Sequence, residues 1–163
     1  MFISDFINLP ELKGIFGSRP HHFATELRRF NELPKRKTGY AKDKYVTPQE
    51  AAKLIITLYA ANSLKAVPET IKLYKTRADD NPTLLDLVAM AIQDGTAQFE
   101  KIEFDVNLPI CTVIWASDAG AKSIIKADHC QSDQRNFITK TVLESRFLEQ
   151  LHFDINPTSA KPN

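Results

Sequence analysis

The spacing of apolar residues in this 163-residue chain changes near Gly95, and that change limits the folds that the chain can adopt. Before Gly95, apolar residues recur every three or four positions, which is typical of amphipathic helices. After it, apolar and acidic residues alternate from Ile102 to Val106, and a β-rich run extends from Ile110 to Trp115. We therefore predict an α+β fold, with an N-terminal helical region followed by a small antiparallel sheet and a C-terminal helix.

Proline, glycine and capping signals set the bounds of the expected elements. The expected helices cover 9–16, 20–33, 47–62, 68–75, 82–94 and a segment starting at 141, and the expected strands cover 102–106, 110–115, 123–127 and 137–139. The last helix is expected to start with a capping box at Thr141 to Glu144 and to place Leu143 on its apolar face.

The helix that starts at Thr47 is expected to be the central buried helix. Thr47 and Glu50 match a capping box, in which each side chain binds a free backbone amide of the first turn. Apolar residues nearly encircle the rest of the helix, and its polar stripe is expected at Gln49, Lys53 and Thr57.

The net charge of +1 conceals a strong asymmetry between the two halves of the chain. Residues 1–77 contain 14 Lys and Arg against 7 Asp and Glu, whereas residues 78–163 contain 7 against 13. Such an imbalance is expected when one half faces a polyanion and the other does not. Basic residues are concentrated at 28–44, so the candidate partner surface lies in the helical half.

The first two expected helices, with Gly17 in the turn between them, have the layout of a helix-turn-helix. In that motif the second helix enters the major groove of DNA and directs its N-terminal side chains at base edges. Arginine can bind guanine, and threonine can contact a base edge or the methyl group of thymine. The polar residues expected to face DNA in and beside this helix are Arg19, His21, His22, Thr25, Arg28 and Arg29. A solvated polar face without a partner is the alternative.

A basic segment containing Gly39 follows Pro34, which is expected to end the second helix. Lysine and arginine bind phosphates and gain affinity by releasing counterions from DNA. The residues expected to lie along the DNA backbone are Lys35, Arg36, Lys37, Tyr40, Lys42 and Lys44. A solvated loop is again the alternative, but the segment adjoins the candidate recognition helix. We therefore predict binding of double-stranded DNA.

A family resemblance depends on four features: Leu27-Arg28, Leu33-Pro34-Lys35, the basic segment, and Thr47 to Ala52 leading into Leu54 to Ile56. In these features the segment from Leu9 to Ala61 resembles small helix-turn-helix proteins of bacterial prophages and mobile elements. The resemblance implies a DNA-binding role in the control of a phage or mobile element, and it implies no catalytic residue. The chain departs from the family pattern in its loop, which has Gly39 where a Gly-rich sequence is expected.

An enzyme is the first alternative, because Asp128, His129 and Cys130 place a carboxylate, an imidazole and a thiol side by side. Catalytic groups of this kind usually come from separate elements that converge in space, so we predict that the protein is not an enzyme. The chain has no nucleotide-binding glycine motif and no zinc-type spacing of Cys and His, so we expect no cofactor and no metal ion.

The second alternative is a non-enzymatic inhibitor or adaptor of a host protein that acts through the acidic C-terminal half. The acidic residues that could form its surface are Asp79, Asp80, Asp86, Asp94, Glu100, Glu103, Asp105 and Asp118. Acidic residues spread over several elements more often form a solvated face.

The sequence as a whole predicts a sequence-specific DNA-binding regulator. Residues 1–95 would form the helical DNA-binding region, 96–155 a β-containing region for homodimerisation or partner binding, and 156–163 a disordered tail. The helix at 20–33 and the loop at 34–45 would read DNA.

The chain has no apolar run near the roughly 20 residues needed to cross a membrane and no signal peptide, so we expect a cytoplasmic protein with no membrane partner.

Overall fold

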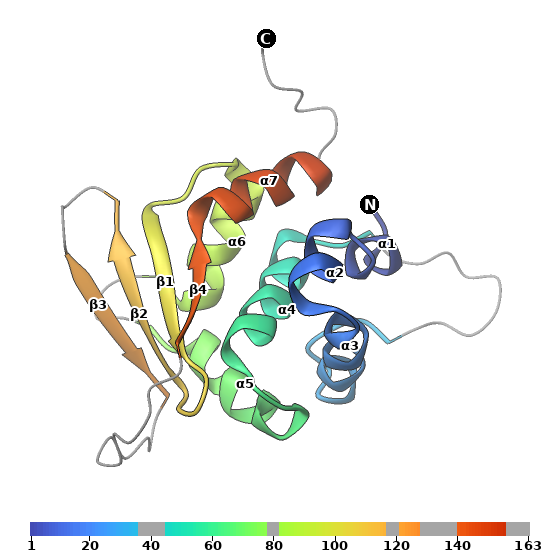
Figure 1. Ribbon diagram of the computed structural model, residues 1–163, viewed down its shortest axis with the longest axis horizontal. Coiled ribbons are helices and arrows are strands. Elements are labelled where there is room, and N and C mark those ends of the chain that lie inside the picture. The colour runs from blue at the N-terminus through green and yellow to red at the C-terminus, as the bar shows by residue number, and fades with distance from the viewer. Residues whose placement is uncertain (36–44, 78–81, 117–120, 128–139, 156–163) are drawn as a thin grey trace, which may run out of the picture.

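The computed structural model describes residues 1–35, 45–77, 82–116, 121–127 and 140–155 (Figure 1). In chain order the elements are α1 (Ile3–Ile7), α2 (Pro10–Phe16), α3 (Arg19–Arg29), α4 (Pro48–Ala60), the 3-10 helix η1 (Leu64–Ala66), α5 (Val67–Lys75), α6 (Leu84–Asp94), β1 (Phe99–Asp105), β2 (Ile110–Trp115), β3 (Lys122–Lys126), β4 (Lys140–Glu144) and α7 (Ser145–Ile155). The expected strand at 137–139 and the expected disordered tail at 156–163 lie outside the described residues.

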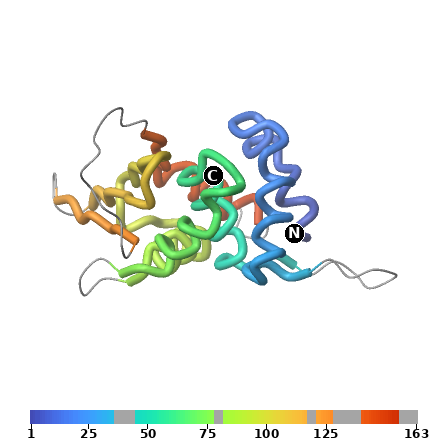
Figure 2. Tube along the Cα trace, turned by 90° about the horizontal axis from the view of Figure 1, so that it is seen from below, coloured from blue at the N-terminus to red at the C-terminus, as the bar shows by residue number. Residues whose placement is uncertain are grey.

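The four strands form one antiparallel sheet in the order β3-β2-β1-β4. Figure 1 shows this sheet at one end of the molecule and helices α1 to α3 at the other, with α4 and α5 between them. Figure 2 shows the same separation of the blue N-terminal helices from the yellow and orange strands. The predicted α+β class with a C-terminal helix is confirmed. None of the helices in the described ranges is long and apolar enough to cross a membrane.

Helix α4 is buried at the centre of the molecule, as its apolar composition predicted. It contacts α3, α5 and α6, together with strands β1 and β4. The predicted capping box is present: the amide of Glu50 donates to Thr47 Oγ1 at 3.2 Å, and the amide of Thr47 donates to the Glu50 carboxylate at 2.9 Å. The expectation that Thr57 belongs to a polar stripe is wrong. Thr57 is fully buried, and its hydroxyl donates to the carbonyl oxygen of Lys53 at 2.7 Å.

Apolar and polar side chains alternate along strand β1, so that one face of the sheet packs into the core. Ile102 and Phe104 of β1 are fully buried, whereas Glu103 between them lies on the opposite face. Cross-strand register places Glu103 opposite Thr112 of β2, and Phe104 opposite the buried Cys111. The core face of β1 contacts α4 and α7, which join the sheet to the helical part of the fold.

The predicted capping box at Thr141 to Glu144 is wrong, because these residues lie in strand β4. Their backbone pairs with β1, and the Thr141 hydroxyl donates to the carbonyl oxygen of Tyr59 at 2.5 Å. Helix α7 therefore starts at Ser145, and Leu143 is buried as a strand residue.

The N-terminal helices also differ from the prediction. Helix α3 ends at Arg29 because Asn31 has a φ of 59°, a left-handed conformation that asparagine tolerates and that ends helices. Helix α1 was not predicted, since its five residues carry no side-chain cap.

Gly95 ends α6, as predicted, and also fixes the position of α7. Its φ of 70° is a left-handed conformation. A Cβ atom at residue 95 would lie 2.9 Å from Cδ2 of His152 in α7. Nδ1 of His152 lies 2.9 Å from the carbonyl oxygen of Ile92, so the imidazole joins α7 to the C-terminal turn of α6.

We predict that the substitutions Gly95→Ala and Gly14→Ala change stability in opposite directions. Gly95→Ala should lower the free energy of unfolding by about 1–2 kcal/mol, because alanine disfavours positive φ and its Cβ meets His152. Gly14 lies inside α2, and a Cβ atom added there would meet nothing within 4 Å, so Gly14→Ala should raise stability by about 0.5–1 kcal/mol. Urea denaturation measures both changes, and equal effects would contradict the role given to Gly95.

Candidate nucleic-acid interface

The two helices predicted on either side of Gly17 are confirmed. Helices α2 and α3 are separated by Gly17 and Ser18 alone and contact each other. Gly17 has a φ of 60°, which favours glycine, and its amide donates to the carbonyl oxygen of Lys13 at 2.9 Å. Leu12 and Phe16 are buried on the inner side of α2. The tight turn sets the direction in which α3 leaves α2.

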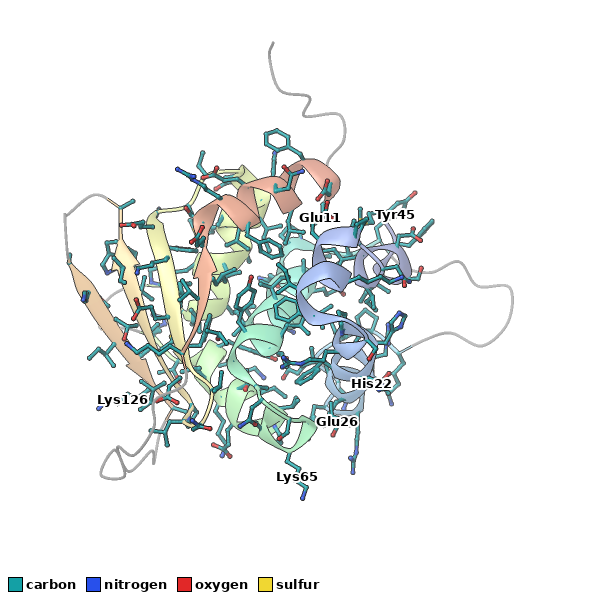
Figure 3. The ribbon with its side chains drawn as sticks, in the orientation of Figure 1. Glu11, His22, Glu26, Tyr45, Lys65 and Lys126 are labelled. Atoms are coloured by element: carbon teal, nitrogen blue, oxygen red, sulfur yellow. The ribbon has the colours of Figure 1, made fainter. Side chains whose placement is uncertain are left out.

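Helix α3 has one buried face and one open face. Phe23, Ala24 and Leu27 enter the core, which attaches the helix to the molecule through its apolar side. The residues of the open face are His21, His22, Thr25 and Arg29, all of them exposed. Figure 3 shows the labelled His22 on the side of the molecule away from the sheet. Four of the residues predicted to contact DNA are therefore brought together on one helix surface.

The open face has local hydrogen bonds that leave much of its surface available. Nε2 of His21 lies 3.1 Å from Oδ1 of Asn8, and the Thr25 hydroxyl donates to the carbonyl oxygen of His21 at 2.9 Å. Arg29 forms an ion pair with Glu26 at 3.2 Å, yet its side chain is 76% exposed. Exposed pairs of this kind contribute little to stability, so Arg29 can exchange Glu26 for another anion.

Arg19 was predicted to face DNA, but in the structure its side chain makes contacts within the protein. Its guanidinium donates to the carbonyl oxygens of Ala61 at 2.6 Å and Leu58 at 3.3 Å. It also lies over the rings of Phe16 and Phe23, at 5.8 and 5.1 Å from their centroids. These carbonyl groups mark the C-terminal end of α4, where a cation is favoured by the helix dipole. Arg19 therefore caps the central helix.

Arg28 also departs from the predicted exposed face. Its side chain is half-buried, and its Nε donates to the carbonyl oxygen of Pro34 at 3.2 Å. Pro34 precedes Lys35, the exposed first cation of the basic segment. Arg28 therefore holds the chain at the point where it enters that segment.

Glu32 joins this part of the chain to the two helices behind it. Its carboxylate forms ion pairs with Lys53 of α4 at 3.0 Å and with Lys75 of α5. Burial raises the pKa of Glu32, but hydrogen bonds from Lys75 and Lys53 outweigh this effect and hold the pKa below its ordinary value of 4.5. Tyr74 lies against the same carboxylate, and burial together with the Glu32 charge raises the pKa of its phenol.

Five of the predicted backbone-contacting residues lie outside the described residues: Arg36, Lys37, Tyr40, Lys42 and Lys44. The described chain resumes at Tyr45, which forms an isolated antiparallel bridge with Phe2. The amide of Val46 donates to the carbonyl oxygen of Met1 at 3.0 Å. Both ends of the basic segment are therefore anchored, through Pro34 on one side and this bridge on the other. Sequence analysis missed Phe2 and Tyr45, whose pairing has no local sequence signal.

A concave surface of about 470 Å³ lies near the base of the basic segment. Its lining residues are Asn31, Glu32, Leu33, Pro34, Thr47, Gln49, Glu50 and Lys53. Its charged side chains are already engaged: Glu32 pairs with Lys53, and the Glu50 carboxylate accepts from the amide of Thr47.

Two of the described acidic residues of the C-terminal half, Glu103 and Asp86, have side-chain partners. Glu103 forms ion pairs with Lys101 and Lys140, each at 3.0 Å, and hydrogen bonds from Lys140 and Lys101 lower the pKa of Glu103. Asp86 accepts a hydrogen bond from the Thr83 hydroxyl at 2.6 Å. The described part of the sheet is thus a mixed surface of both signs.

The described residues include none of the three side chains on which the enzyme alternative depends. Asp128, His129 and Cys130 lie outside the described residues. Cys111 is buried, and burial raises its pKa to about 12, which disfavours the nucleophilic thiolate. Within the described ranges, no group of three or more His, Cys, Asp or Glu side chains is placed to hold a metal ion.

Comparison with known proteins returns no match among protein-family models, curated proteins or solved structures.

The substitution Glu32→Gln should remove a pH-dependent part of the stability. Because the folded-state pKa of Glu32 is lowered, its ion pairs stabilise the protein above pH 4.5, and this contribution is lost as the pH falls toward the folded-state pKa. Melting temperatures should therefore differ most between wild type and Glu32→Gln at neutral pH and converge once the pH falls below the folded-state pKa of Glu32. Glu100→Gln, an exposed change on β1, controls for the loss of one carboxylate. A constant difference across the titration would contradict the assignment.

Proposed function

We propose that this protein is a sequence-specific regulator that binds double-stranded DNA through α3 and the adjoining basic segment at 34–45. The observation that carries the proposal is the open face of α3. It presents His21, His22, Thr25 and Arg29 together, and the basic segment follows the C-terminal end of the same helix, where Arg28 binds Pro34. On this proposal the protein controls genes of a prophage or mobile element.

The first half of α3 would contact the bases. His21, His22 and Thr25 occupy its first two turns, the part of a recognition helix that approaches base edges in the major groove. Phe23 and Leu27 fix the helix from behind, so its polar side chains are presented on a rigid element. Rigid presentation reduces the entropy lost on binding.

The second half of α3 and the basic segment would contact phosphates. Arg29 is highly exposed, Lys35 follows Pro34, and four further cations lie between 36 and 44. Phosphate contacts fix the register of a protein on the duplex, whereas base contacts provide specificity. The two groups of residues therefore have different roles, and their substitutions should have different effects.

The β-containing region would supply self-association. Helix-turn-helix proteins commonly read paired half-sites as symmetric dimers. Strands β3 and β4 lie at the two edges of the described sheet. Because β3 begins with Lys122 and ends with Lys126, pairing of two β3 edges would bring lysines together, so β4 is the more favourable edge for a dimer.

Binding of duplex DNA should depend steeply on salt. If the open face and the basic segment neutralise about four to six phosphates, the slope of log affinity against log salt concentration should be about −4 to −5. Fluorescence anisotropy of a labelled duplex across a series of NaCl concentrations measures this slope. No binding at micromolar protein in low salt would refute the proposed function.

Substitutions in the helix and in the segment should separate specificity from affinity. Thr25→Ala should weaken binding to the preferred site by about 0.5–1.5 kcal/mol, the contribution of one hydrogen bond, and change binding to random DNA much less. Lys37→Ala should weaken both by similar factors and make the salt slope shallower by about one unit. The matched control is Lys126→Ala, an exposed cation on β3 at the opposite end of the molecule from His22 (Figure 3). Indistinguishable behaviour of Thr25→Ala and Lys37→Ala would exclude α3 as the reading element.

A further inference from the structure

Phe2 and Tyr45 form an ordered aromatic pair where the chain returns from the basic segment. Their backbones make an antiparallel bridge, and their rings stack with centroids 4.8 Å apart and planes 20° apart. Helices α1 to α3 and the whole basic segment separate the two residues along the chain, so the fold creates the pair and the local sequence does not.

The pair is firmly held, although Tyr45 is largely open. Tyr45 is 66% exposed, one of the largest exposures among the large hydrophobic residues in the described part of the chain. Phe2 covers one face of the Tyr45 ring. The neighbouring residues Ile3 and Val46 are both 7% exposed and anchor the backbone of each partner in the core. A ring held in this way loses little conformational entropy when it meets a partner.

The position of Tyr45 relates it to the candidate DNA-binding surface. Figure 3 shows Tyr45 and His22 on the part of the molecule opposite the sheet. Asn8, which follows α1, contacts His21 of the open face, so α1 connects the Phe2 end to α3. The ten residues before Tyr45 include five lysines and arginines. Tyr45 therefore directly follows, along the chain, the cations that would bind a polyanion.

We propose that Tyr45, positioned by Phe2, contacts the sugar-phosphate backbone of duplex DNA. The Tyr45 hydroxyl donates a hydrogen bond to a phosphate oxygen, and the open part of the ring packs against a deoxyribose. Tyrosine is among the side chains that make such contacts in protein–DNA complexes. This inference rests on the proposed DNA-binding function and adds a neutral contact to it. A neutral group adds affinity without releasing a counterion from DNA.

The test compares Tyr45→Phe and Tyr45→Ala with Lys35→Ala in anisotropy titrations of one labelled duplex at several salt concentrations. Tyr45→Phe keeps the stacked ring and removes only the hydroxyl, so affinity should fall about 3- to 10-fold, the effect of one hydrogen bond. Tyr45→Ala should cause a larger loss. Both variants should keep the wild-type salt slope, whereas Lys35→Ala should make it shallower by about one unit.

Ile124→Ala is the matched control, because Ile124 on β3 is 60% exposed and lies on the sheet. Ile124→Ala should bind DNA with wild-type affinity. Melting curves should show that Tyr45→Phe is folded. Wild-type affinity of both Tyr45 variants would overturn this inference alone. Absence of binding by the wild-type protein would overturn the proposed function as well. Loss of self-association in sedimentation without loss of DNA affinity would show that the pair contacts a second copy of the chain, and would also overturn the inference.

Discussion

The burial of α4 is the constraint on which the rest of the structure depends. A helix leaves free amides in its first turn and free carbonyls in its last turn, and these groups need hydrogen-bond partners. The N-terminal end is closed by Thr47 and Glu50 within its own sequence. The C-terminal end is closed by Arg19, which comes from the start of α3. The same guanidinium that completes α4 therefore fixes the helix that carries the candidate DNA-binding face.

The connections between α4 and the candidate interface continue at the other end of α3. Lys53 of α4 binds both the carboxylate and the backbone carbonyl of Glu32, each at 3.0 Å. Val46, directly before the cap of α4, is hydrogen-bonded to Met1. The chain is thus fixed to α4 both before and after the basic segment. Lys35 and Tyr45, the proposed DNA contacts on either side of the segment, would consequently be held in place by their attachment to α4.

Local signals in the sequence were sufficient for most of the fold. The α+β class, the central helix with its capping box, the end of α6 at Gly95 and the hairpin of β1 and β2 depend on periodicity and on single capping residues. One error occurs where distant contacts override a local pattern. Thr141 matches a capping residue, yet strand pairing and the carbonyl oxygen of Tyr59 place it in β4.

The candidate site was predictable to a lesser degree for the same reason. Helical spacing correctly placed His21, Thr25 and Arg29 on an exposed surface. It could not show that Arg19 binds the end of α4 or that Arg28 binds Pro34, because both contacts need the tertiary fold. Tyr45 was overlooked because its stacking partner lies at the other end of the N-terminal helical region. A basic residue near a predicted recognition helix is thus not by itself a DNA contact.

The most direct measurement of the central claim is a ¹H–¹⁵N NMR titration of the protein with duplex DNA. Amide shifts should change along α3 from His21 to Arg29, and at Lys35 and Tyr45 on either side of the basic segment. Amides of β3 and of α6 should remain unchanged. Changes concentrated on the sheet, or no changes at saturating DNA, would contradict the account.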